Sequence, residues 1–159
     1  MKAGRILVVD DEDSIRSTLN DYFTGLGYAV VTANDGEDAL KKFAPGAFDC
    51  VISDLFMPTI DGLDLLKRIN IEDKDVFFLI ITGFPGIDSA VNAMKEGAYD
   101  YITKPFHMED IRLKVERALK AKKTEEALKK IKGLFLSLII LMPVLVTLGI
   151  IFGVLWKGI

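Results

Sequence analysis

The chain has 159 residues, half of them hydrophobic, and a formal net charge of −3 at pH 7. This length is enough for one domain of ordinary size with a full core. The slightly negative charge provides no basic surface suited to nucleic acid, so we expect no nucleic acid partner. Cys50, the only cysteine, cannot form an intrachain disulfide or a cysteine metal cluster. The apolar run at residues 6–9 is too short for a signal peptide.

Short apolar runs alternate with helical patterns through most of the chain. Strands are predicted over residues 6–9, 29–33, 50–54, 76–82 and 99–103. Helices are predicted over residues 14–26, 36–44, 62–70, 87–96 and from residue 108 onward. Strands that alternate with helices in this way imply an α/β fold, with a parallel sheet covered on both faces. Right-handed crossovers favour the flavodoxin-like strand order 2-1-3-4-5.

Reactive side chains occur where the predicted strands end. Asp10 and Asp11 follow the first strand, Asp54 ends the third, Thr82 ends the fourth and Lys104 follows the fifth. In open parallel sheets, ligands bind beyond the carboxyl ends of the strands. Helix capping can explain any one of these residues, but it does not explain why all of them fall at one edge. We therefore expect a common site there.

The residue types at this edge indicate phosphoryl chemistry. Three converging carboxylates repel each other unless a cation lies among them, and all-oxygen ligands with open water positions suit Mg²⁺. A carboxylate beside Mg²⁺ can attack a phosphoryl group and hold it as an aspartyl phosphate. Mg²⁺ and the ammonium of Lys104 would neutralise charge on the phosphoryl oxygens, and the Thr82 hydroxyl could donate to one of them.

Four segments in chain order resemble the motifs of the receiver domain of bacterial two-component response regulators. They are ILVVDDE at residues 6–12, DLFMP at 54–58 with DG at 61–62, ITG at 81–83 and YITKPF at 101–106. The resemblance covers about residues 4–121. Each motif alone is a weak signal, but four in order at strand ends are a strong one.

The resemblance implies a role for each residue of the site. Asp54 would be the phosphoacceptor, and Thr82 and Lys104 would hold the phosphoryl group. Tyr101 would be the aromatic switch that turns inward together with Thr82. A sensor histidine kinase or a phosphotransfer protein would supply the phosphoryl group, and an unidentified downstream protein would respond to it.

The resemblance also implies a magnesium site. Asp11 would bind Mg²⁺ directly and Asp10 would bind it through water. Asp54 and the backbone carbonyl of Phe56 would be further ligands. Phosphorylation from a phosphodonor would then be Mg²⁺-dependent and catalysed by the chain itself, although the protein is not a conventional enzyme.

Self-dephosphorylation is expected to be slow. Water must attack in line, opposite the Asp54 oxygen. The side chains nearest that approach should be Phe56 and Phe84, two residues beyond Asp54 and two beyond Thr82. Neither ring can orient a water by hydrogen bonding, and both can exclude it by their bulk.

The expected function is a phosphorylation-dependent signalling switch, and no DNA-binding output domain follows the receiver pattern. One alternative is a phosphate sink or phosphorelay intermediate, which would drain phosphoryl groups from a kinase. Another is a structural membrane adaptor with an unused receiver fold. The presence of both Asp54 and Lys104 argues against the adaptor.

The C-terminal segment has a different composition. Residues 134–156 contain no Asp, Glu, Lys or Arg, and at about 1.5 Å per residue they exceed a hydrocarbon core of roughly 30 Å. We therefore expect a receiver domain over residues 1–121, a lysine-rich helical spacer over 122–133 and a transmembrane helix over 134–156. The positive-inside rule places the receiver in the cytoplasm, tethered to the lipid of the cytoplasmic membrane. Gly149 and Gly153 form a GxxxG pattern that would allow a homodimer.

Overall fold

A computed structural model of the chain describes residues 4–157, without the side chains of residues 125–126 and 144–157. Two compact units divide the chain, Met1–Lys120 and Ala121–Ile159. The first unit contains the sheet and the predicted site. The second unit contains only the continuation of the last helix among its described residues.

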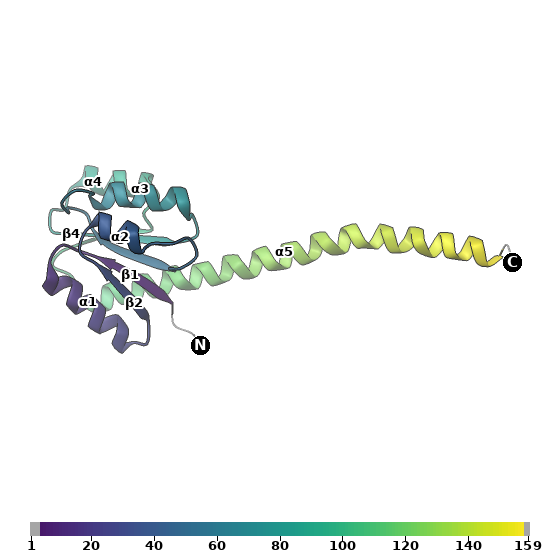
Figure 1. Cartoon of the computed structure of the whole chain (residues 1–159), viewed down its shortest axis with the longest axis horizontal. Coiled ribbons are helices and arrows are strands. Elements are labelled where there is room, and N and C mark those ends of the chain that lie inside the picture. Colours follow the sequence, from purple (N-terminus) through teal and green to yellow (C-terminus); the bar gives the residue numbers. More distant parts are fainter. Residues whose placement is uncertain (1–3, 158–159) are drawn as a thin grey trace. The chain divides into compact units, whose positions relative to one another are not determined.

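Strands and helices alternate along the described residues (Figure 1). The strands are β1 Arg5–Val9, β2 Ala29–Ala33, β3 Cys50–Asp54, β4 Phe77–Thr82 and β5 Asp100–Thr103. The helices are α1 Asp13–Gly25, α2 Gly36–Lys42, α3 Gly62–Glu72, α4 Ile87–Lys95 and α5 Met108–Lys157. Every strand and helix predicted for the sheet region is present, with ends that differ by at most two residues. Such differences are usual, because helix ends fray and predicted boundaries are less certain than the elements themselves.

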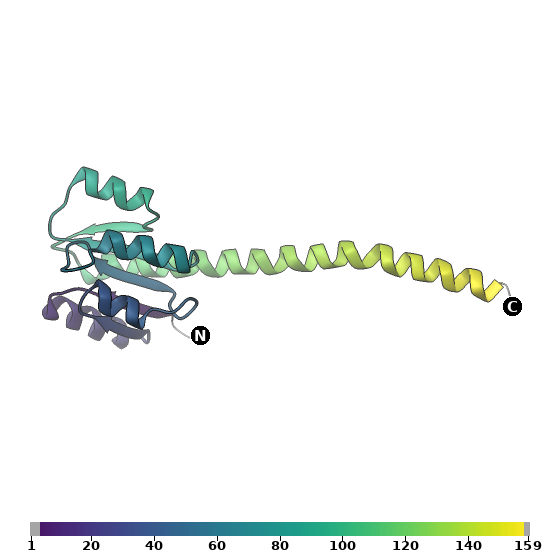
Figure 2. The same cartoon turned by 45° about the horizontal axis from the view of Figure 1, so that its top comes forward.

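All strand pairs are parallel, and the strand order is β2-β1-β3-β4-β5. The predicted flavodoxin-like order 2-1-3-4-5 is therefore confirmed. Helices lie on both faces of this sheet (Figures 1 and 2). Because the strands are parallel, their carboxyl ends share one edge, and the loops that follow β1, β3, β4 and β5 meet there.

Each face of the sheet has its own hydrophobic core, because successive residues of a strand point to opposite faces. On one face, Leu7, Val51 and Ile80 belong to a buried cluster that includes residues of α2, α3 and α4. On the other face, Ile6 and Cys50 belong to a cluster that includes residues of α1 and α5. Cys50 is fully buried, so its thiol is part of this second core.

Thr59, in the loop between β3 and α3, is exposed and has a positive φ of 67°. A β-branched residue rarely adopts this conformation, whereas Asn tolerates it better. We expect Thr59→Asn to raise the free energy of unfolding by about 1 kcal/mol, measured by urea denaturation. Thr24→Asn is the control, because Thr24 is exposed in the last turn of α1 and has no positive φ. An equal gain in both variants would show that backbone strain is not the cause.

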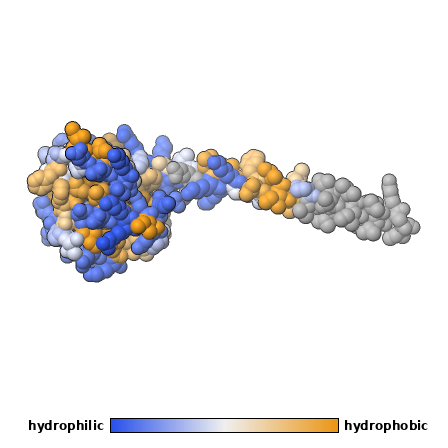
Figure 3. Space-filling model, turned by 90° about the horizontal axis from the view of Figure 1, so that it is seen from above, coloured by the Kyte–Doolittle hydropathy of each residue, from blue (hydrophilic) through white to orange (hydrophobic). Residues whose placement is uncertain are grey.

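In the second unit, the described side chains of α5 change from lysine-rich to apolar (Figure 3). The described apolar run covers residues 134–143. Within the part of the chain that the structure describes, no helix combines the length and the apolar character needed to cross a membrane.

The prediction that residues 134–156 span a membrane is therefore wrong. The predicted localisation at the cytoplasmic membrane and the predicted lipid partner depended on it, and they are wrong for the same reason. The structural membrane adaptor loses its basis for the same reason. Gly149 and Gly153 lie outside the residues whose side chains are described.

Candidate functional site

The carboxyl ends of β1, β3 and β5 bring together two carboxylates and one ammonium. Lys104 Nζ lies 3.0 Å from Asp10 Oδ2 and 2.7 Å from Asp54 Oδ1. Asp10 is only 1% exposed and Asp54 only 6%. Buried charges must be paired, and Lys104 can compensate only one of the two carboxylates. The three groups therefore carry a net negative charge when both carboxylates are ionised.

Burial and hydrogen bonding have opposite effects on the pKa values of Asp10 and Lys104. Burial raises the pKa of Asp10, because removal from water disfavours the charged carboxylate. Two contacts lower the pKa of Asp10 instead. The Glu12 N–H donates to Asp10 Oδ1 at 2.8 Å, and the ammonium of Lys104 pairs with the same carboxylate. For Lys104, burial lowers the pKa, but the hydrogen bonds to Asp54 and Asp10 outweigh it, so the pKa is raised. Lys104 is therefore an ammonium at neutral pH.

The carboxylate of Asp54 is held through both oxygens. Oδ2 accepts a hydrogen bond from the Phe56 N–H at 2.7 Å, and Oδ1 faces the ammonium of Lys104. Asp54 ends β3, which is paired with β4 beside it. These contacts fix the orientation of a carboxylate that still reaches the surface at the edge of the sheet.

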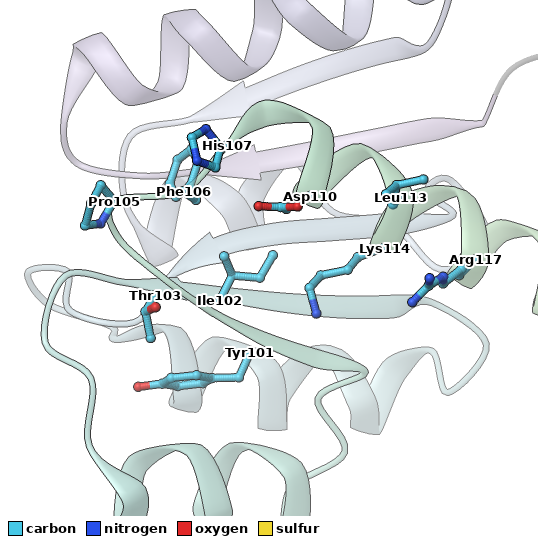
Figure 4. A pocket seen from close by; sticks show the side chains of 10 residues that line it. All are labelled: Tyr101, Ile102, Thr103, Pro105, Phe106, His107, Asp110, Leu113, Lys114 and Arg117. Carbon is cyan, nitrogen blue, oxygen red and sulfur yellow. The ribbon is translucent and has the colours of Figure 1, made fainter.

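Thr82, at the end of β4, is fully buried. Its hydroxyl oxygen accepts a hydrogen bond from the Phe84 N–H at 3.1 Å. The Lys104 N–H donates to the Thr82 carbonyl at 2.7 Å, which ties the end of β4 to the residue that follows β5. Tyr101, on β5, is half-buried, and its hydroxyl lies 2.9 Å from Ser89 Oγ on α4. Tyr101 also lines a surface pocket between β5 and the start of α5 (Figure 4).

Two phenylalanine rings stand beside the acidic site. Phe56 is 53% exposed and Phe84 is 75% exposed. Their ring centroids are 5.7 Å apart and the rings meet edge to face. Their backbone N–H groups are the ones that bind Asp54 and Thr82. The rings therefore form an apolar rim next to the candidate acceptor.

Asp11 is exposed after the end of β1. Among the described residues, no group of three His, Cys, Asp or Glu side chains is placed to hold a metal ion. The donor chemistry nevertheless fits a hard cation, because Asp10 and Asp54 offer oxygen ligands and Lys104 compensates only one of their two negative charges. The ligand set of Asp10, Asp11, Asp54 and the Phe56 carbonyl stays a prediction.

Two polar contacts of this region were not predicted from the sequence. Arg16 Nη1 donates to the Asp10 carbonyl at 2.6 Å, and Ser89 Oγ contacts the Tyr101 hydroxyl. Both residues lie on helices and outside the motifs. Their positions depend on how α1 and α4 pack, for which the sequence provides no local signal.

The response regulator receiver domain model matches residues 6–116. The chain therefore belongs to the response regulator receiver domain family, whose members are phosphorylation-dependent signalling switches. Receiver domains accept a phosphoryl group from histidine kinases, and the family generally depends on Mg²⁺.

Two similar proteins are regulatory proteins. The chain is 35% identical over 126 residues to the regulatory protein AtoC of Escherichia coli (strain K12). The match covers 79% of this chain and 27% of AtoC. It is 36% identical over 117 residues to the transcriptional regulatory protein FixJ of Bradyrhizobium diazoefficiens. This match covers 74% of this chain and 57% of FixJ. The chain thus spans less than two thirds of the length of either relative.

Solved receiver domains have the same fold over almost their whole length. A response regulator receiver domain protein from Clostridium thermocellum is 33% identical with a TM-score of 0.72, and the match covers 76% of this chain and 98% of that one. The non-phosphorylated HemR receiver domain from Leptospira biflexa is 33% identical with a TM-score of 0.70, covering 73% of this chain and 94% of that one.

Proposed function

We propose that Asp54 is the phosphoacceptor of this switch. The observation that carries the proposal is the carboxylate of Asp54 at the strand-end edge, with one oxygen held by a backbone N–H and the other 2.7 Å from Lys104. An Asp54 oxygen would form a bond to the phosphorus of a phosphohistidine. The phosphorus–nitrogen bond would break, and the imidazole would leave with its electron pair.

Lys104 and Thr82 would hold the transferred group. The ammonium of Lys104 is next to the attacking oxygen and needs little movement to reach a phosphoryl oxygen. The Thr82 hydroxyl would donate to another of these oxygens. Mg²⁺ bound by Asp10, Asp11, Asp54 and the Phe56 carbonyl would neutralise further charge on the phosphoryl group.

The response would pass through Tyr101. In this proposal, Tyr101 turns inward as Thr82 moves toward the phosphoryl group, and a downstream protein recognises the changed surface. Residues 1–121 would form the receiver domain, and residues 122–133 would be a helical spacer.

Chemical labelling tests the acceptor. The full chain is incubated with acetyl phosphate in the presence and absence of Mg²⁺, and the intact mass is measured. We expect one phosphoryl group, only with Mg²⁺, and peptide mapping should place it on the peptide that contains Asp54. A label on any other peptide would overturn the assignment.

The aromatic rim leads to a prediction about the lifetime of the phosphoryl group. Phe56 and Phe84 cannot orient an attacking water, whereas polar side chains at these positions can. We expect the double variant Phe56→Asn with Phe84→Glu to lose phosphate about tenfold faster, which corresponds to roughly 1.4 kcal/mol of barrier. The decay of labelled protein measures this rate.

The control for this experiment is Phe56→Leu with Phe84→Leu, which keeps apolar bulk and adds no hydrogen-bonding group. Its phosphate should decay at close to the wild-type rate. Slow decay in the wild type suits a switch more than a phosphate sink. If the wild type already loses phosphate as fast as the polar variant, the rings do not exclude water.

A further inference from the structure

A chain of hydroxyl groups joins β5 to the start of α4. Ser89 Oγ donates to the Gly86 carbonyl at 2.9 Å, and the Tyr101 hydroxyl lies 2.9 Å from the same Oγ. A serine hydroxyl has one hydrogen to donate. Because Ser89 donates it to Gly86, Tyr101 must donate its own hydrogen to Ser89. The order of donation therefore runs from Tyr101 through Ser89 to the backbone of Gly86.

The start of α4 has few other attachments. Its N-cap, Gly86, provides no side-chain cap, whereas α2 and α3 begin with the capping aspartates Asp35 and Asp61. Ala93 is the one residue of α4 that is fully buried, and Ile87 in its first turn is 85% exposed. The hydrogen bond between Ser89 and Tyr101 therefore ties the first turn of α4 to β5.

The site around Asp54 has the arrangement expected without a phosphoryl group. Lys104 bridges Asp10 and Asp54, and the Tyr101 hydroxyl is bonded to Ser89 on α4. The hydrogen bond between Tyr101 and Ser89 thus belongs to the unphosphorylated arrangement of the receiver.

We propose that Ser89 is a positioning residue that holds Tyr101 against α4 in the unphosphorylated receiver. This inference rests on the proposed role of Tyr101 as the switch. When Tyr101 turns inward, its hydroxyl leaves Ser89, and the first turn of α4 loses this tie to β5. The hydrogen bond between Tyr101 and Ser89 stabilises only the unphosphorylated state, so it makes phosphorylation less favourable. Because the coupling is reciprocal, phosphorylation makes the hydrogen bond less favourable by the same factor.

A titration with beryllium fluoride, a mimic of the aspartyl phosphate, tests the inference in the presence of Mg²⁺. Ser89→Ala removes the hydroxyl and keeps a good helix former, so α4 should still fold. We expect the affinity of Ser89→Ala for beryllium fluoride to be about three- to tenfold higher than that of the wild type, the range expected for one lost hydrogen bond. Ser89→Thr keeps a hydroxyl and should bind like the wild type.

A double-mutant cycle separates this role from a general effect on α4. Tyr101→Phe removes the same hydrogen bond from the other side, so Ser89→Ala should change the affinity no further in the Tyr101→Phe background. An unchanged or lower affinity in Ser89→Ala, or full additivity in the double variant, would overturn the inference. Labelling of each variant by acetyl phosphate tests Asp54 separately. If the wild type is not labelled, the assignment of Asp54 as the acceptor fails, and this result says nothing about Ser89.

Discussion

Asp54→Asn is expected to abolish phosphorylation completely. The amide of Asn is not a nucleophile at neutral pH, and it cannot form the acyl phosphate. The variant should still fold, because Lys104 keeps its contact with Asp10 and the Asn oxygen can accept from the Phe56 N–H. The buried site then contains one positive and one negative charge, which removes the net negative charge. Intact mass after incubation with acetyl phosphate and Mg²⁺ measures the result.

The control for this variant is Asp64→Asn. Asp64 lies in the first turn of α3, and its side chain is 57% exposed in an ion pair with Lys67. Loss of this exposed pair should have little effect, and the variant should be phosphorylated like the wild type. If Asp54→Asn is also phosphorylated like the wild type, the acceptor is another residue.

Gly62→Ala is expected to lower the free energy of unfolding by about 3 kcal/mol. A Cβ at Gly62 would lie 2.2 Å from the Asp54 carbonyl oxygen and 3.0 Å from Leu55 Cα. Both are backbone atoms, so no side-chain rotation can relieve the overlap. The start of α3 must move away from the end of β3 and weaken the 2.8 Å hydrogen bond from the Gly62 N–H to the Leu55 carbonyl. Urea denaturation measures the loss.

Gly25→Ala is the matched control, since a Cβ at Gly25 meets nothing within 4 Å. Gly25 is the last residue of α1, where Ala is a better helix former than Gly. The control should therefore be as stable as the wild type or more stable. The displacement of α3 from the end of β3 should also slow phosphorylation of Asp54 in Gly62→Ala. Equal stability of Gly62→Ala and the wild type would show that the close approach of α3 to β3 is not required.

The sequence alone was sufficient for the sheet, because apolar runs and helix patterns are local signals. The parallel order 2-1-3-4-5 follows from short, right-handed connections between such elements, and the structure has this order. The same patterns place Asp10, Asp54, Thr82 and Lys104 at strand ends, and parallel pairing then brings them to one edge. Hydropathy was misleading for residues 134–156, because a count of apolar residues along the chain does not establish a membrane-spanning helix.

Only the tertiary structure showed which groups touch. Lys104 could have paired with either carboxylate, and the packing of β1, β3 and β5 places it between Asp10 and Asp54. The bond from Tyr101 to Ser89 depends on the distance between β5 and α4, which no local pattern specifies. Secondary structure arises from neighbouring residues, so the sequence determined the elements and the residue types at the site. Side-chain contacts arise between segments far apart in the chain, so their geometry was decided by how the elements pack.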